Sequence, residues 1–256
     1  MKIATFNVNS IRKRMPIVLD WLNANKPDVM CLQETKVVDQ DFPLPPLTDA
    51  GYHVTFRGMK AYNGVATLSL KKPEKVVHGF HEGPDSEDFR MLQTVINGVM
   101  IINTYVPQGY LIDSPKYQYK LGWFKRLQKY FDTHLGPKVP AIWLGDMNVA
   151  PSPLDVHSPE KHLKHVCYHE DAQKAYRETV EGRFTDVFRA RYPDRIQYTF
   201  WDFFANSFAT NKGWRIDHIM ATPPMAKRCT AVDVDLTPRR APSPSDHTVL
   251  WADFSD

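Results

Sequence analysis

The stretch "PAIWLGDMN", residues 140–148, joins an apolar run to an aspartate and an asparagine. The apolar run predicts a buried strand, and Asp146 stands at its end. Taken alone, an acidic residue at a strand end is more often part of a turn or a cap. A sheet nevertheless fixes the backbone there while the side chain reaches into a crevice, so the stretch also indicates a functional site.

The first part of the chain predicts a strand, a helix and a second strand. Residues 3–8 alternate between apolar and polar side chains, and Ser10 then stands where an N-cap would begin a helix. Apolar residues recur at helical spacing as far as residue 22. Pro27 ends this helix, and "DVMCLQE", residues 28–34, predicts the second strand.

A hairpin and further helices follow. Asn97 and Gly98 lie between two β-branched runs, a pattern typical of a type I′ hairpin turn. Helical spacing over residues 117–131 predicts a long amphipathic helix, and a shorter helix is expected near residues 171–180. Further strand-like stretches are "YHVTFR" (52–57), "GVATLSL" (64–70), "YTFWDFF" (198–204), "WRIDHIM" (214–220), "TAVDVDL" (230–236) and "TVLWADF" (248–254). Hairpins mixed with helical crossovers, with no linker between them, predict an α/β fold of two packed mixed β-sheets with helices outside, as a single domain over residues 1–256.

The composition leaves the function open. A chain of 256 residues with 43% hydrophobic residues can bury one large core, and a net charge of +3 does not indicate a polyanionic partner unless the cations cluster. Cys31, Cys167 and Cys229 are odd in number, which favours reduced thiols over disulfides. No apolar run approaches the ~18 residues of a membrane span, and the first residues lack the pattern of a signal peptide, so we expect a cytoplasmic protein.

Six apolar runs end on, or begin from, a polar residue that a buried strand does not need. One such residue would be weak evidence, but six together indicate a site at the ends of the strands. These residues are Asn7, Glu34, Tyr105, Asp146, Asp217 and the pair Asp246–His247.

The oxygen atoms of this set suit a hard divalent cation. Glu34 and Asp246, with the amide oxygen of Asn7 or Asn148, form a donor set of the kind that binds Mg²⁺ or Mn²⁺. The chain also holds a group of His and Cys residues, but irregular spacing on a proline-broken loop is a poor zinc signature, so we expect structural or surface roles for them. That group is His157, His162, His165, Cys167 and His169.

Seven motifs in chain order carry a family resemblance. They are "FNVNSIR" (6–12), "LQETK" (32–36), "NGVA" (63–66), "TYVPQG" (104–109), "GDMNVAP" (145–151), "GWRIDHIMAT" (213–222) and "PSDHTVL" (244–250). The chain thereby resembles the exonuclease III family of apurinic/apyrimidinic (AP) endonucleases over nearly its whole length. The resemblance implies a four-layer α/β sandwich of the endonuclease/exonuclease/phosphatase type, a divalent metal and DNA as substrate. Asn9 stands where many relatives have aspartate, a difference that concerns a metal-tuning role of this position and not the main site.

The resemblance also implies a metal site and a candidate for activating water. Glu34 is the principal Mg²⁺ ligand, helped by Asn7 and Asp246. Asp146 is the candidate that orients and deprotonates the attacking water. Asn148, two residues on in a strand, is expected on the same face, where it can donate to a phosphate oxygen. The full set of candidate metal ligands is Asn7, Glu34, Asp146, Asn148, Asp246 and His247.

Three further residues complete the implied catalytic set. His247 binds the scissile phosphate as a cation, and Asp217 orients its ring and favours its charged form. Tyr105 contacts the phosphate or the leaving group. The sequence does not decide whether Asp146 or the Asp217–His247 pair activates the water.

Contacts with DNA require cations and apolar surfaces beside the motifs. Phe208, Trp214 and Ile216 are expected to line a pocket for a base-less sugar flipped out of the duplex, whereas Trp201 is expected in the core. Candidates for phosphate contacts that position the duplex are the loop residues Arg12, Lys36, Gln108, Lys212 and Arg215. A basic run on or just before the long helix is expected to be a solvated face, and it comprises Lys116, Lys120, Lys125, Arg126 and Lys129.

The motifs and the resemblance together imply a divalent-metal-dependent DNA repair nuclease that cuts 5′ to abasic sites in duplex DNA. They also imply 3′–5′ exodeoxyribonuclease and 3′-phosphatase or phosphodiesterase activity. We expect a monomer that acts on double-stranded DNA with abasic or 3′-blocked lesions, away from membranes. Two alternatives stay open: a phosphatase or phosphodiesterase of the same superfamily acting on another phosphoester, and a catalytically silent nucleic-acid-binding module.

Overall fold

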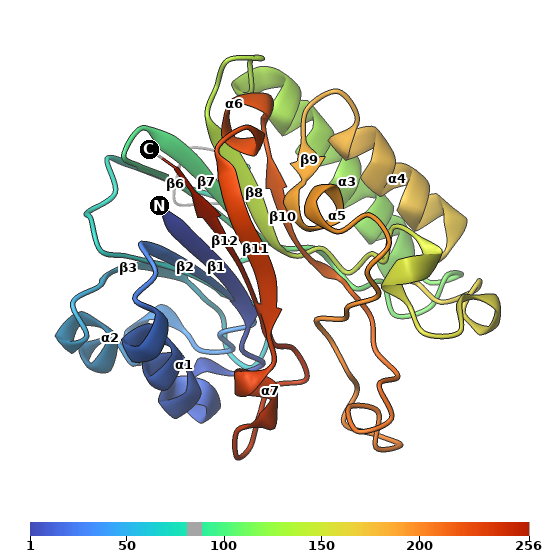
Figure 1. Cartoon of the computed structure of the whole chain (residues 1–256), viewed down its shortest axis with the longest axis horizontal. Coiled ribbons are helices and arrows are strands. Elements are labelled where there is room, and N and C mark those ends of the chain that lie inside the picture. The colour runs from blue at the N-terminus through green and yellow to red at the C-terminus, as the bar shows by residue number, and fades with distance from the viewer. Residues whose placement is uncertain (81–88, 256) are drawn as a thin grey trace.

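Two six-stranded mixed sheets form the centre of the molecule in the computed structural model, which describes residues 1–80 and 89–255 (Figure 1). The first sheet, sheet A, contains in spatial order β11 (Cys229–Asp235), β12 (Val249–Phe254), β1 (Lys2–Asn7), β2 (Val29–Gln33), β4 (Val65–Ser69) and β3 (His53–Arg57). The second, sheet B, contains β5 (Lys75–His78), β6 (Met91–Ile96), β7 (Val99–Tyr105), β8 (Ala141–Asp146), β10 (Asp217–Ala221) and β9 (Thr185–Asp186).

Each sheet contains one parallel pair of strands, and a long helix connects the two strands of each pair. Helix α1 (Ile11–Asn25) joins β1 to β2, and helix α3 (Pro115–His134) joins β7 to β8. The remaining pairs are antiparallel. Parallel strands end at the same edge of a sheet, so the carboxyl ends of β1, β2, β7 and β8 are available for one site.

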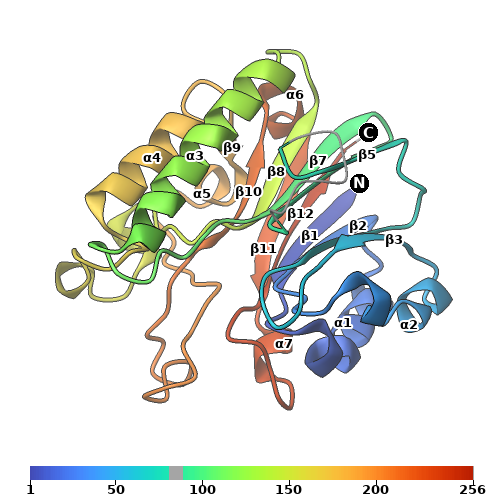
Figure 2. The same ribbon diagram turned by 180° about the vertical axis from the view of Figure 1, so that it is seen from behind.

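Helices cover the outer face of each sheet, which gives the four layers that the resemblance implied (Figures 1 and 2). Helices α1 and α2 (Pro45–Asp49) lie over sheet A, and α3 and α4 (Glu170–Val180) lie over sheet B. Three apolar clusters fill the three spaces between the layers. The shorter elements are α5 (Val187–Arg191), α6 (Pro223–Ala226), α7 (Thr237–Arg240) and the 3₁₀ turns η1 (Asp39–Asp41), η2 (Pro153–Asp155) and η3 (Pro159–Lys161).

Local sequence signals account for several of these elements. Asn97 and Gly98 both have positive φ, 52° and 69°, as the type I′ turn between β6 and β7 requires. Ser10 is the N-cap of α1 as predicted, although its side chain makes no capping hydrogen bond. The stretch 198–204 is not a strand, which corrects the prediction. Within it Phe200 makes only isolated bridges to Trp214 and His247, so this aromatic segment is a loop over the site.

A buried polar network joins the two sheets just below their carboxyl ends. Gln33 of sheet A donates from Nε2 to Oδ1 of Asn103 in sheet B over 2.7 Å and to the hydroxyl of Thr5 over 3.0 Å. Asn103 in turn donates to the backbone oxygens of Leu32 and Ala66. Since buried polar groups are costly unless they are paired, this network favours one alignment of the sheets.

The three cysteines are free, as predicted. None of the helices within residues 1–80 and 89–255 combines the length and the hydropathy of a membrane span.

Candidate active site

Strand register places three of the predicted residues in a row at the edge of sheet B. Tyr105 of β7 pairs with Asp146 of β8, and Asp146 pairs with Asp217 of β10. Gly145 allows this close packing because its φ is 134° and a side chain there would come within 2.0 Å of the Thr104 oxygen. Only glycine fits the backbone conformation and the close contact at position 145, and Asp146, the next residue, lies in the site.

Asn7 links the two sheets at the same edge. Its Nδ2 donates to Oε1 of Glu34 over 2.8 Å and to Oδ2 of Asp146 over 2.9 Å. Its Oδ1 accepts from the backbone N–H of Asn9 over 3.0 Å, so the nitrogen of the amide faces the carboxylates. Asn7 therefore holds Glu34 of sheet A against Asp146 of sheet B.

His247 completes the centre and is held between two carboxylates. Its Nδ1 lies 2.8 Å from Oδ2 of Asp217, and its Nε2 lies 3.6 Å from Oδ2 of Asp146. Burial alone would lower the pKa of His247, but the carboxylates of Asp217 and Asp146 outweigh burial and raise it. Burial raises the pKa of Asp146, whereas the charged imidazole opposes that rise. The ring is therefore the preferred site of the proton, although burial leaves the pKa of Asp146 above its ordinary value.

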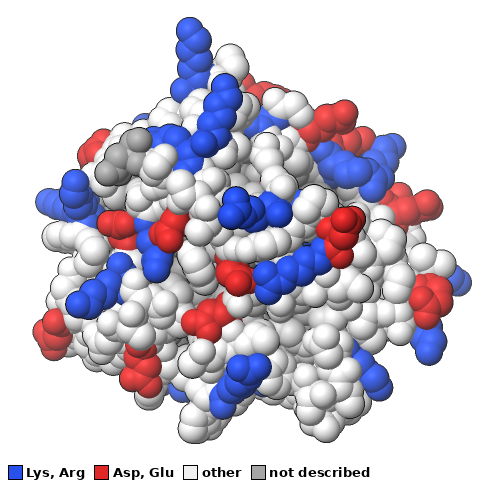
Figure 3. Space-filling view, viewed as in Figure 1, with Lys and Arg blue, Asp and Glu red and all other residues white. Residues whose placement is uncertain are grey.

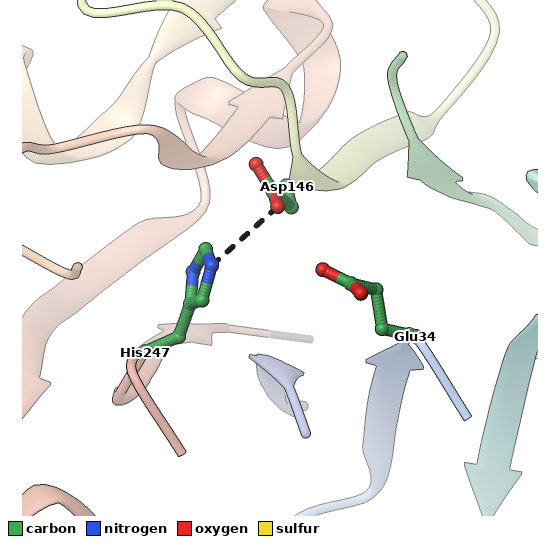
Figure 4. A group of neighbouring side chains, drawn as sticks. All are labelled: Glu34, Asp146 and His247. Carbon is green, nitrogen blue, oxygen red and sulfur yellow. Dashed lines mark ion pairs between the residues drawn. The ribbon is translucent and has the colours of Figure 1, made fainter. Parts of the chain in front are cut away.

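Glu34, Asp146 and His247 point toward one another from three different segments (Figure 4). Each offers one donor atom, and these atoms lie within 4.8 Å of one another. The Asn7 amide bridges the two carboxylates, and oxygen donors of this kind also suit Mg²⁺ or Mn²⁺. The residues thus fit a hard divalent ion, with Glu34 and Asp146 as the charged ligands.

The other predicted ligands are placed less directly. Oδ1 of Asp246 accepts from Asn9 Nδ2 over 3.0 Å, and Oε2 of Glu34 pairs with Lys36 Nζ at 2.8 Å. Lys36 also donates to Oδ1 of Asn9 over 2.6 Å. Asp246 and Glu34 are therefore joined through Asn9 and Lys36 on the sheet A side of the site.

Asn148 reaches the site by a different route from the one predicted. Strand β8 ends at Asp146, and Asn148 has a left-handed backbone with φ 49°, so the two residues do not share a strand face. Instead the backbone N–H of Asn148 donates to Oδ1 of Asp146 over 2.9 Å, and its Nδ2 donates to the Val106 oxygen over 2.9 Å. The short Asx-type turn, not the alternation of a strand, places both side chains at the cavity.

A cavity of about 260 Å³ opens over these residues. Gln108, Trp214 and Ile216, which the sequence placed at a DNA or sugar contact, line it. His165, Cys167, Phe200 and Asp202 line it as well and were not predicted to do so. The full lining is Glu34, Tyr105, Gln108, Asp146, Asn148, His165, Cys167, Phe200, Asp202, Trp214, Ile216, Asp246 and His247.

The His and Cys group was expected to have structural or surface roles. Three of its histidines pack around the Trp214 ring, which lies 4.8 Å from the ring of His162 and 4.4 Å from that of His165. His165 and Cys167 also line the cavity. Their irregular spacing hid this role, because a loop brings them together around one tryptophan. The signal that could have found them is the proximity of the loop to "GDMN" in the chain.

Three basic or aromatic side chains lie away from the positions predicted for them. Arg215 is buried, with its guanidinium 2.7 Å from both Asp155 and Asp186, so it cannot contact DNA phosphates. Phe208 packs edge-on against Trp201, with ring centroids 5.1 Å apart, and lies outside the cavity lining. Lys120 is fully buried and is not part of a solvated face. Each correction concerns a tertiary contact that the local sequence does not record.

The remaining candidates for DNA contact are at the surface. Arg12 and Lys212 are exposed, and Gln108 is exposed at the cavity rim. On the face drawn in Figure 3, basic and acidic side chains lie interspersed. Cations of this face are thus distributed among acidic groups, in keeping with the small net charge of +3.

The chain is similar to known proteins over nearly its whole length. Residues 4–247 match the model of the Endonuclease/Exonuclease/phosphatase family. Exodeoxyribonuclease III of Haemophilus influenzae is 32% identical over 266 residues, covering 99% of this chain and 100% of the relative. A solved AP endonuclease from Archaeoglobus fulgidus is 49% identical over 100% of both chains, with a TM-score of 0.96. A Neisseria 3′ phosphatase bound to a product DNA hairpin is 36% identical over 100% of both chains, with a TM-score of 0.94.

Two stacked sheets with a carboxylate–histidine site at one edge define the class of fold and site. The chain belongs to the endonuclease/exonuclease/phosphatase family, within its exonuclease III and AP endonuclease branch. The resemblance drawn from the seven motifs is therefore confirmed.

Proposed function

We propose that the chain is a divalent-metal-dependent DNA repair nuclease that hydrolyses the phosphodiester bond 5′ to abasic sites in duplex DNA. We also propose 3′–5′ exodeoxyribonuclease and 3′-phosphatase or phosphodiesterase activities at the same site. The observation that carries the proposal is the position of Asp146, which hydrogen-bonds to Asn7 on one side and faces the Asp217-bound His247 on the other. This arrangement suits in-line attack of water on a phosphoryl group.

The chain's own residues supply most of the charge that hydrolysis needs. His247 would bind a nonbridging phosphate oxygen as a cation, since Asp217 fixes its ring and stabilises its charged form. Asn148 would donate its second amide hydrogen to another phosphate oxygen, because its first hydrogen is bound by Val106. A metal ion bound by Glu34 and Asp146, with Asn7 and Asp246 nearby, would polarise the phosphate and stabilise the leaving oxyanion.

Asp146 is the candidate for orienting and deprotonating the water. Its carboxylate is buried, and it faces a ring whose proton is already stabilised by Asp217. A base must be unprotonated to accept a proton, and the protonated ring favours that form of Asp146 against the larger opposing effect of burial, which leaves its pKa above the ordinary value. The alternative is that the Asp217–His247 pair activates the water. Burial raises the pKa of Tyr105, and the nearby carboxylates of Glu34 and Asp146 raise it further. Tyr105 would therefore act as a neutral donor to the phosphate or leaving group.

The cavity suits a sugar that has lost its base. Trp214, Ile216 and Phe200 provide the apolar part of its wall. A pocket of this kind would accept a flipped abasic sugar and exclude an intact nucleotide by size. Arg12, Lys36, Gln108 and Lys212 are the candidates for holding the surrounding duplex through its phosphates.

End-labelled duplexes test the proposal directly. One carries an abasic analogue, one a recessed 3′ end and one a 3′-phosphate, each incubated with Mg²⁺, Mn²⁺ or EDTA. We expect incision on the 5′ side of the analogue in the presence of metal and none with EDTA. Binding of all three duplexes without any hydrolysis would instead support the catalytically silent module. Hydrolysis of small phosphoesters without action on any duplex would support the superfamily phosphatase.

A further inference from the structure

A lysine lies buried directly behind the cavity wall and has no part in the function described so far. Lys120 stands on helix α3, and its side chain is fully buried. Tyr117, Lys120, Phe124 and Leu127 recur at helical spacing on the buried face of α3, so Lys120 occupies a position that would otherwise be apolar. A buried lysine is costly unless its charge is compensated, which calls for a specific role.

The ammonium group of Lys120 contacts three backbone oxygens and, within residues 1–80 and 89–255, no carboxylate. Nζ donates to the oxygen of Asn148 over 2.7 Å, to that of Val166 over 2.7 Å and to that of Gln108 over 3.2 Å. Carbonyl oxygens only accept, so the three contacts use all three N–H groups of a protonated ammonium. The charge is therefore compensated by oriented backbone dipoles.

Each of the three acceptors belongs to a different loop that lines the cavity. Gln108 and Asn148 line it themselves, and Val166 lies between two lining residues, His165 and Cys167. Gln108 follows β7, Asn148 follows β8, and Val166 belongs to the loop before α4. One side chain thus bridges all three segments, which are otherwise joined in pairs, by the bonds from Asn148 Nδ2 to the Val106 oxygen and from the Ala150 N–H to the Cys167 oxygen.

We propose that Lys120 is a positioning residue for phosphodiester hydrolysis, tying the loops of Gln108, Asn148 and Val166 into one cavity wall. The inference rests on the proposed function, because it concerns the placement of Asn148 against the phosphate. Asn148 is sensitive to this support, since its backbone lies in the left-handed region with φ 49°. Without the ammonium, its carbonyl oxygen would lose a hydrogen bond, and the turn that aims its side chain would be free to relax.

The test compares Lys120→Met with Lys125→Met. Both remove one ammonium from α3 and leave a side chain of similar length, but Lys125 is exposed. Incision of a duplex with an abasic analogue is measured at saturating Mg²⁺. We expect Lys120→Met to lower kcat by at least ~10-fold while KM stays within a few-fold, and Lys125→Met to match the wild type. A role in stability alone would lower the unfolding midpoint and leave kcat of the folded protein unchanged, which would overturn the proposal.

A double-mutant cycle asks whether Lys120 acts through Asn148. If it does, adding Lys120→Met to Asn148→Ala lowers kcat little further, whereas independent effects multiply. Multiplied effects would overturn the assigned route. Should Lys120→Met fail to fold, Lys120→Gln retains two N–H donors, and it is expected to keep an intermediate kcat. Wild-type kcat for Lys120→Gln would also overturn the proposal. A wild-type protein inactive on every duplex would instead refute the proposed function itself.

Discussion

Asp146 and Asp217 are paired in register across β8 and β10, and each carboxylate faces a different nitrogen of the His247 ring. A histidine held in this way has a fixed orientation and a fixed tautomer once it loses its proton. The two aspartates are nevertheless not equivalent. Asp217 is hydrogen-bonded to the ring, whereas Asp146 also accepts from Asn7 of the other sheet and borders the cavity.

Asp217→Asn is expected to impair activity more at pH 8 than at pH 6. The carboxylate raises the pKa of His247, so its removal lowers that pKa and deprotonates the ring at high pH first. The measurement is KM for an abasic duplex at both pH values. A KM that rises by at least ~10-fold at pH 8 and by a few-fold at pH 6 is expected. An equal rise at both values would show that Asp217 acts only by orienting the ring.

Glu34→Gln is expected to increase the Mg²⁺ concentration needed for half-maximal incision by at least ~10-fold, because one charged ligand is lost. The exposed Glu178→Gln on α4 serves as the control for a lost surface carboxylate. Calorimetric titration of Mg²⁺ into the free proteins provides a second measurement that does not depend on turnover. An unchanged metal requirement would remove Glu34 from the ligand set.

Asp146→Asn and Asn148→Ala are each expected to lower turnover by at least ~10²-fold, with affinity for abasic DNA within a few-fold of the wild type. Both groups act on charge that develops mainly in the transition state. Single-turnover rates and fluorescence anisotropy separate the two quantities. Equal losses in binding and turnover would show that the variant removed a ground-state contact, and its catalytic role would then be wrong.

Trp214→Ala is expected to reduce the preference for abasic sites over normal nucleotides. Trp214 forms part of the cavity wall, and a larger cavity excludes an intact nucleotide less well. The measurement is the ratio of incision rates on one duplex with and without an abasic analogue, after circular dichroism confirms folding. Trp251→Ala, on β12 beneath Lys2, makes the same change at a tryptophan that does not line the cavity. If both variants keep the wild-type ratio, selectivity originates elsewhere.

Acid is expected to destabilise the wild type through the buried ion pairs of Arg215. Burial would raise the pKa of Asp155, but Arg215 outweighs burial and holds it below its ordinary value. The stabilisation is therefore complete above the unfolded pKa of about 3.9 and is lost as the pH falls through the lower folded value. Arg215→Met should cost about 3–5 kcal/mol at pH 7. In urea unfolding, the stability of Arg215→Met should also fall less between pH 5 and pH 3 than that of the wild type.

An exposed ion pair supplies the control for this measurement. Arg195 and Asp233 are 3.0 Å apart at the surface, and Arg195→Met should cost only about 0–1 kcal/mol. Equal costs for the two arginine variants would contradict a structural role for the buried pairs.

Features with a local cause could be predicted from the sequence. The hairpin at Asn97–Gly98 follows from the backbone preferences of two residues, and the polar strand ends are visible as polar residues at the ends of apolar runs. The carboxyl-end cluster could be expected because parallel strands end together. The motifs then supplied the family and, with it, the four layers.

Features that depend on contacts distant in the sequence could not be predicted. Lys120 and Arg215 both look like solvated cations, because nothing local shows the carbonyl oxygens or carboxylates that pair with them. Lys120 did carry one signal, its place on the apolar stripe of a helix, where a solvated lysine is unexpected. Phe208 has the composition of a pocket residue, but its loop turns it toward Trp201.

Strands β1 and β12, the first and last strands of sheet A in chain order, lie side by side. This pairing has a consequence for synthesis of the protein. Ser245 donates its hydroxyl hydrogen to the Asn7 oxygen, 238 residues away in sequence, just before His247 enters the site. During translation, Glu34 and Asp146 leave the ribosome long before His247 does. A nascent chain, or a product of premature termination before residue 247, therefore carries the carboxylates without the imidazole. Under the role proposed for His247, such chains would lack nuclease activity.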